Sequence, residues 1–218
     1  MTSYSNPARL KQLFDEEVNL FIEQTGESKK LHEKSAGPMM NGVPMSWMAK
    51  WPGPYPVYVK SAKGAHFSDV DGNDYVDFCL GDTGAMVGHS PDASITAIKN
   101  QLEKGITLML PTEDAAIAAQ TLADRFGVEK WQFTLTATDA NRHIIRYARH
   151  ITGRKKILIH DYCYHGTVDE TFANLDESGN TVSRVNNIGA PVDPKETTWV
   201  VPFNDLAAAE KAFASGEI

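Results

Sequence analysis

Beyond residue 90, segments with helical periodicity alternate with short apolar segments, and this alternation restricts the fold more than any other feature of the chain. Helices are expected at 92–104, 113–126, 139–151 and 205–215, and strands at 131–136, 155–161 and 197–203. Strands that alternate with helices form a parallel sheet with right-handed crossover connections. The sequence therefore predicts an α/β domain that begins near residue 91.

The first 90 residues show two other patterns. Residues 8–24 are amphipathic and predict a helix, which the polar residues after Gly26 are expected to end. The segment 35–56 holds five prolines and is expected to be an extended arm without regular structure, whose apolar side chains pack against another surface. After it, a strand, an Asp71-Gly72 turn and a second strand are expected. The predicted organisation is an N-terminal helix and arm over 1–56, a small β unit over 57–90, and the α/β part over 91–218.

Composition excludes several classes of partner and location. The net charge is −7 and no basic run occurs, which argues against nucleic acid and anionic membranes as partners. No apolar run approaches the length of about 18 residues that a membrane span needs. The first residues show no secretion signal or transit peptide, and Cys79 and Cys163 are too few for a disulfide framework. A cytoplasmic location is expected.

Small and hydroxylated residues separate the strand expected at 131–136 from the next helix. Thr136, Ala137 and Thr138 would lie at the helix N-terminus, where unpaired N–H groups attract an anion and small side chains let a phosphate approach. The alternative is a capping box between Thr136 and Asp139, which needs no ligand. No P-loop or Rossmann glycine fingerprint is present, which argues against ordinary nucleotide binding.

Two further groups of residues are candidates for a site. Tyr164 and His165 follow the strand expected at 155–161, and open α/β sheets build their sites at such strand ends. The tyrosine ring would stack on a flat cofactor, with His165 near its edge. A zinc site formed by His160, Cys163 and His165, or a purely structural role, are the alternatives. Asp82, in the glycine-rich loop over 80–91, would either cap a turn or face a substrate amine.

Five motifs occur in order along the chain: DVDGNDYVDF at 69–78, GHSP at 88–91, FTLTATDAN at 133–141, TGR at 152–154 and YHG at 164–166. Their order and spacing resemble class III (subgroup II) pyridoxal-phosphate-dependent aminotransferases, the group that includes glutamate-1-semialdehyde 2,1-aminomutase. The resemblance implies the PLP-dependent transferase fold of type I, with pyridoxal 5'-phosphate as cofactor. It also implies a homodimer with active sites at the subunit interface.

The resemblance assigns a role to each candidate residue. Thr136, Ala137 and Thr138 match the segment that holds the cofactor phosphate, where Ser-Gly-Thr is usual. Tyr164 matches the aromatic residue that stacks on the pyridine ring, and His165 lies beside it. Two further residues are expected to contact substrate, and both depart from the aminomutase pattern: Trp47, where an arginine is usual, and Asp82, where an aromatic residue is usual.

The family's Schiff-base lysine has no counterpart in this sequence, so no catalytic residue is expected within it. The chain is expected to be the N-terminal half of an enzyme and inactive alone. The expected reaction transfers an amino group between an amine or amino acid and a carbonyl acceptor. One alternative is a 2,1-aminomutase, and another is a non-catalytic fragment that binds a full-length homologue.

Overall fold

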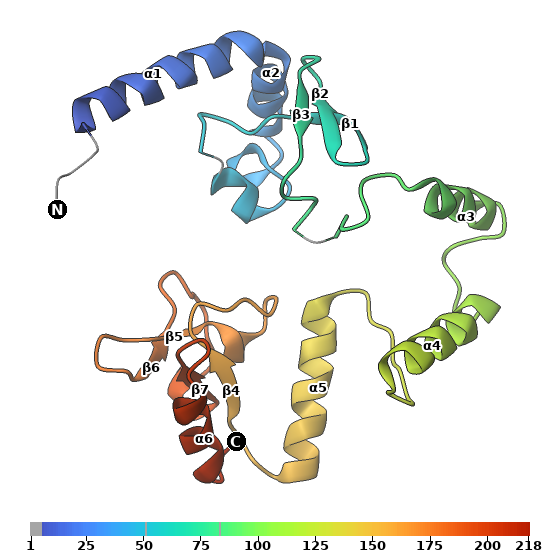
Figure 1. The fold of residues 1–218 in the computed structure, drawn as a ribbon, viewed down its shortest axis with the longest axis vertical. Helices are drawn as coiled ribbons and strands as arrows, with labels where there is room; N and C mark the ends of the chain where they lie inside the picture. The colour runs from blue at the N-terminus through green and yellow to red at the C-terminus, as the bar shows by residue number, and fades with distance from the viewer. Residues whose placement is uncertain (1–5, 51, 83) are drawn as a thin grey trace. The chain divides into compact units, whose positions relative to one another are not determined.

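The computed structural model describes residues 6–50, 52–82 and 84–218, which form two compact units, Met1–Met109 and Leu110–Ile218. Figure 1 shows the path of the chain within each unit. Among the residues described, no helix is both long enough and apolar enough to cross a lipid bilayer. The three-part organisation expected from the sequence stays a prediction.

The first unit combines helices with a three-stranded antiparallel sheet of order β1-β2-β3. Its elements are α1 (Pro7–Gln24), α2 (Gly26–Ser35), the 3-10 helices η1 (Met40–Gly42) and η2 (Ser46–Lys50), β1 (Val59–Lys63), β2 (His66–Asp69), β3 (Asp74–Val76) and α3 (Asp92–Leu102). The strand, turn and strand expected around Asp71-Gly72 are confirmed as β2 and β3. Phe67 and Tyr75 are cross-strand partners, and their rings stack with centroids 4.7 Å apart.

Asp69 organises the turn between β2 and β3. Its buried carboxylate accepts hydrogen bonds from the backbone N–H groups of Asp71 and Asn73, from the Asn73 side chain at 3.0 Å and from the Tyr75 hydroxyl at 2.8 Å. Burial raises the pKa of Asp69, but these hydrogen bonds outweigh it and leave the pKa below its usual value. The turn is therefore built around a charged carboxylate.

Helix α2 corrects the expectation that helical structure ends at Gly26. Its own N-cap residue, Thr25, makes no side-chain cap. Instead the Asp71 carboxylate accepts from the backbone N–H groups of Glu27 at 2.6 Å and Ser28 at 3.0 Å, and from the Ser28 hydroxyl at 2.7 Å. A cap supplied by a residue more than 40 positions away leaves no local signal in the sequence.

The proline-rich arm is more regular than expected, because it contains η1 and η2. Some of its apolar side chains are buried and others are exposed. Val43 and Tyr55 are buried, and the Tyr55 hydroxyl lies 3.2 Å from the hydroxyl of Thr25, whereas Met40 and Trp47 are exposed.

The second unit is built on a parallel pair of strands. Its elements are α4 (Glu113–Phe126), α5 (Ala137–Thr152), β4 (Ile157–His160), the 3-10 helix η3 (Asp169–Thr171), β5 (Ala173–Leu175), β6 (Thr181–Ser183), the 3-10 helix η4 (Pro194–Glu196), β7 (Thr198–Val201) and α6 (Leu206–Ala214). β4 pairs with β7 in parallel, as expected, with Ile157 opposite Thr198. Ile159 of β4, Val200 of β7 and Ala173 of β5 form the buried core of this unit.

In this unit one expected strand is absent from the described residues and one hairpin was not expected. Residues 131–136 are not a strand, because a strand needs a hydrogen-bonded neighbour and no described segment pairs with them. Residues 173–183 form an antiparallel hairpin, β5-β6, which the sequence analysis missed. Each of its strands has only three residues, too few for a periodic pattern to be recognised.

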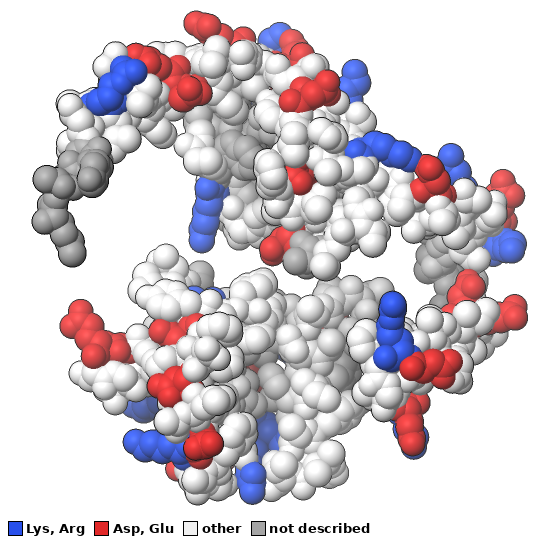
Figure 2. All heavy atoms as spheres, in the orientation of Figure 1, with Lys and Arg blue, Asp and Glu red and all other residues white. Residues whose placement is uncertain are grey.

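Charge is mixed on the surface of both units. Figure 2 shows acidic and basic side chains interspersed on the visible face, with wide uncharged areas between them.

Candidate functional site

The N-terminus of α5 carries the three residues expected to hold a phosphate. Thr136 is the N-cap residue: its hydroxyl accepts from the Asp139 N–H at 3.1 Å and donates to the Asp139 carboxylate at 2.9 Å. The expected capping contact is therefore confirmed. Within the described chain, the N–H groups of Ala137 and Thr138 donate to no acceptor, and they point out from the positive end of the helix dipole. Capping thus leaves donors free for an anion.

The loop that follows β4 lies directly against this helix end. The Thr167 N–H donates to the Thr138 hydroxyl oxygen at 3.0 Å, and the Asn141 side chain donates to the His165 carbonyl at 2.9 Å. Gly166 lies between these contacts with φ +79°, and a Cβ there would lie 2.2 Å from the Thr138 hydroxyl oxygen. Only glycine fits at this position.

The same loop carries the two residues expected beside a cofactor ring. Tyr164 is 69% exposed, and His165 is half-buried with its carbonyl held by α5. The structure therefore brings all five cofactor-binding candidates to one place in the second unit. Their roles as ligands stay predictions.

Asn141, Gly166 and Thr167 are the residues of this site that received no role from the sequence. Asn141 and Gly166 belong to the motifs quoted above, but those motifs indicate no contact for either residue. Their contacts join positions more than 20 residues apart, which no local pattern encodes.

The two substrate candidates lie in the first unit. Trp47 is exposed and lines an apolar hollow of about 320 Å³ together with Val43, Met48 and Tyr58. Asp82 is exposed with φ +54°. Their contact with substrate stays a prediction.

Asp77 holds the turn that comes before Asp82. The Asp77 carboxylate accepts from the N–H groups of Cys79 and Leu80, both at 2.8 Å, and lies 2.7 Å from Nε2 of His89. The hydrogen bond with His89 and those from the backbone lower the pKa of Asp77. An aspartate three residues before the glycine-rich loop is itself a turn signal in the sequence.

The zinc alternative receives no support from the geometry. Among the described residues, no three His, Cys, Asp or Glu side chains are grouped so that they could hold a metal ion. Cys163 is half-buried, and its burial raises the pKa of its thiol despite the nearby Arg184.

Comparison with known proteins shows the family to which the chain belongs. The sequence profile of the family described as aminotransferase class-III matches residues 47–211. A glutamate-1-semialdehyde 2,1-aminomutase from Methanocaldococcus jannaschii is 37% identical over 189 residues, covering 85% of this chain and 43% of that protein. One from Anaeromyxobacter dehalogenans is 35% identical over 192 residues, covering 87% of this chain and 45% of that protein.

Two solved structures extend the comparison. A glutamate-1-semialdehyde aminomutase from Pseudomonas aeruginosa, solved in complex with PMP, has a TM-score of 0.93 and 43% identity, covering 98% of this chain and 47% of that one. An omega-transaminase from Sphaerobacter thermophilus has a TM-score of 0.79 and 28% identity, covering 88% and 45%. The chain thus spans less than half the length of these relatives. Because the family profile matches most of its residues, this chain belongs to the class-III aminotransferase family.

Proposed function

We propose that this chain provides the phosphate- and ring-binding part of a pyridoxal 5'-phosphate enzyme that moves an amino group between an amine or amino acid and a carbonyl acceptor. The observation that carries the proposal is the contact between the α5 N-terminus and the Tyr164–Thr167 loop. It puts free N–H donors and an exposed aromatic ring on adjoining segments. A small ligand with a phosphate at one end and a flat ring at the other suits that arrangement.

The residues present fit the phosphate of such a cofactor. The N–H groups of Ala137 and Thr138 are free, and the helix dipole favours a negative charge there. The Thr138 hydroxyl accepts from the Thr167 N–H, so its own proton is available to an anion. Gly166 keeps the loop backbone against Thr138.

The residues also fit the ring. Tyr164 is largely exposed, so a flat ligand can stack on its face, and His165 is next to it. When bound, the cofactor supplies an electron sink for the substrate carbon, while the protein binds and orients it. The residues of this chain would bind the phosphate and stack on the ring. The chemical step also needs a lysine that bonds to the cofactor. We propose no residue of this chain for that role.

Intramolecular transfer on an amino aldehyde is the second candidate reaction. The identities of 37% and 43% to proteins named as glutamate-1-semialdehyde aminomutases favour it. Trp47 and Asp82, which we propose as substrate contacts, depart from the aminomutase pattern and favour transfer between two substrates. Homodimerisation, small-molecule substrates and a cytoplasmic location belong to the same proposal.

Titration calorimetry with pyridoxamine 5'-phosphate and, separately, with inorganic phosphate tests the proposed cofactor site. The pyridoxamine form has no aldehyde and cannot react with surface lysines. Thr138→Val removes the hydroxyl. It is expected to lower the affinity for both ligands about tenfold, since a hydrogen bond to a charged group contributes about 1.5 kcal/mol. Thr138→Asp adds a negative charge and is expected to abolish the binding of both ligands. Thr138→Ser keeps the hydroxyl and is the matched control.

Variants of Tyr164 distinguish binding of the cofactor ring from binding of its phosphate. Tyr164→Ala is expected to weaken pyridoxamine 5'-phosphate and leave inorganic phosphate unchanged, while Tyr164→Phe retains both affinities because the stacking face remains. If the unchanged chain binds neither ligand, the proposed function is wrong.

A further inference from the structure

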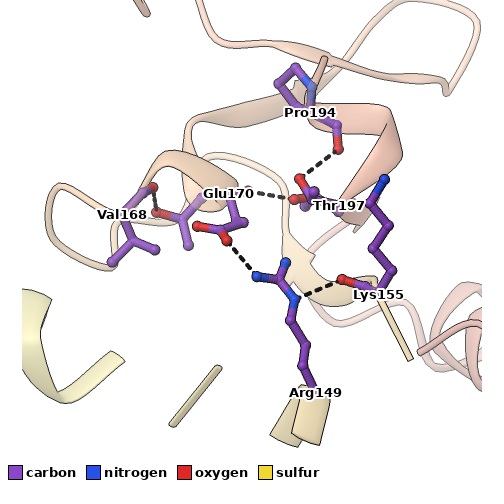
Figure 3. Close-up of polar contacts among 8 residues, drawn as sticks. Arg149, Lys155, Val168, Glu170, Pro194 and Thr197 are labelled. Atoms are coloured by element: carbon purple, nitrogen blue, oxygen red, sulfur yellow. Dashed lines mark hydrogen bonds and ion pairs between the residues drawn. The ribbon is translucent and has the colours of Figure 1, made fainter. Parts of the chain in front are cut away.

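A half-buried ion pair joins the end of α5 to the segment beyond the Tyr164–Thr167 loop. Arg149 donates from Nη1 to the Glu170 carboxylate at 2.6 Å and from Nε to the Lys155 carbonyl at 2.9 Å. The two side chains are 28% and 23% exposed. Figure 3 shows the guanidinium placed between these two acceptors.

Glu170 is fixed from the other side as well. Its backbone carbonyl accepts from the Thr198 hydroxyl at 2.6 Å, which ties it to β7. The neighbouring Thr171 is buried, and its hydroxyl donates to the Val168 carbonyl at 2.8 Å. The short helix η3, which begins three residues after Gly166, is therefore held between α5 and β7.

We propose that Arg149 is a positioning residue that sets where the Tyr164–Thr167 loop lies relative to the α5 N-terminus. This inference rests on the proposed cofactor site and names a part of it that neither sequence motif nor ligand contact indicates. The loop and the segment after it are attached to α5 at two places, near its N-terminus through Thr138 and Asn141 and near its C-terminus through Arg149, which binds Glu170. Asn141 and Arg149 are eight residues apart on the helix, about 12 Å along its axis.

Two separated attachments do what one cannot. Without Arg149, the loop would keep its contacts at the helix end and the hydrogen bond from Arg184 to the Cys163 carbonyl just before it. It would lose its only side-chain tie to the C-terminal half of α5 among the residues described, so the loop and the Tyr164 ring could shift relative to that helix. The second attachment removes that freedom. A rigid ligand that binds by its phosphate and its ring needs the ring and the helix end at a constant separation, so such a shift would weaken ring binding and spare phosphate binding.

Stability alone does not account for an arginine at this position. A half-buried ion pair loses solvation that its attraction barely recovers, and apolar residues of similar size often serve folding as well. Here Nη2 of Arg149 is also buried and donates to no atom in the described part of the chain. What arginine offers is a planar fork that reaches two acceptors in a set direction. Lysine would keep the charge and lose that geometry.

The test compares Arg149→Met and Arg149→Lys with Arg146→Met in the full chain. Arg146 is an exposed arginine on the same helix with no hydrogen bond or ion pair among the residues described, so it controls for loss of a positive charge. Hydrogen exchange of the Thr167 amide reports loop position without any ligand. Calorimetry with pyridoxamine 5'-phosphate and with inorganic phosphate reports the site.

In Arg149→Met we expect the Thr167 amide to exchange at least tenfold faster and pyridoxamine 5'-phosphate to bind about tenfold more weakly, with phosphate affinity unchanged within twofold. Arg149→Lys should restore thermal stability but not the affinity for pyridoxamine 5'-phosphate. Arg146→Met should match the unchanged chain in every measurement. Unaltered exchange in both Arg149 variants overturns the positioning role. So does full recovery of cofactor affinity by lysine. Failure of the proposed function has a different signature, because the unchanged chain would then bind neither ligand while the exchange result still stands.

Discussion

Gly166 is the residue at which backbone geometry most directly controls the candidate site. It has φ +79°, and an added Cβ would meet the Thr138 hydroxyl oxygen at 2.2 Å and the Thr138 Cα at 3.0 Å. Gly179 has φ +80° with nothing within 4 Å, so it shares the backbone strain and lacks the clash. Gly179→Ala should cost about 1 kcal/mol of unfolding free energy because alanine disfavours positive φ, and Gly166→Ala about 2 kcal/mol more because of the added clash. Denaturant unfolding of both variants measures the difference, and equal losses would contradict the close contact.

The two cysteines are expected to differ in reactivity because their surroundings differ. Cys79 is exposed, whereas Cys163 is half-buried and has a raised thiol pKa, so less thiolate is present at pH 8. Iodoacetamide should modify Cys79 at least tenfold faster, as peptide mapping by mass spectrometry would show. In urea the two rates should converge. Equal rates in the folded protein would mean that the surroundings of Cys163 are more open than its burial indicates.

At the scale of elements, α2 depends on a carboxylate from the β2–β3 turn. Asp71 bonds two N–H groups and one hydroxyl of the first turn of α2. Asp71→Ala should cost about 2 kcal/mol, the upper range for loss of a cap, and should speed hydrogen exchange in α2. Glu33→Ala removes an exposed acid from the same helix and serves as the control. If both variants exchange alike, α2 does not need the distant cap.

At the scale of the whole molecule, acid should destabilise the first unit through Asp69. The folded-state pKa of Asp69 is lowered, so the unfolded chain takes up its proton first as pH falls. Its contribution is present above the unfolded value of about 4 and is lost as pH falls from there through the lower folded pKa. Hydrogen exchange of β1–β3 between pH 6 and pH 3 measures this loss, and Asp69→Asn should flatten the dependence. An unchanged slope in that variant would assign the acid sensitivity to other carboxylates.

Base acts on the same turn with the opposite sign. Burial and the neighbouring Asp69 raise the pKa of Tyr75 to about 12. That contribution is present below the unfolded tyrosine value of about 10 and is lost as pH rises towards the folded value.

The sequence by itself determined the features that local chemistry encodes. Periodicity located α1, α3, α4, α5 and α6 and the parallel partners β4 and β7, and the spacing of Thr136 and Asp139 predicted the cap at α5. Motif order predicted the family, which the comparison confirmed. Each of these depends on residues within a few positions of one another, or on a pattern of letters that survives without coordinates.

Only the tertiary structure decided which distant residues meet. Asp71 caps α2, and no described segment pairs with residues 131–136. Gly166 contacts Thr138, and Arg149 forms an ion pair with Glu170. A helix cap, a strand and an ion pair each need a partner atom, and that partner can lie anywhere along the chain. Local sequence limits the structures that a segment can form, and the fold decides whether the partner atoms that each structure needs lie next to it.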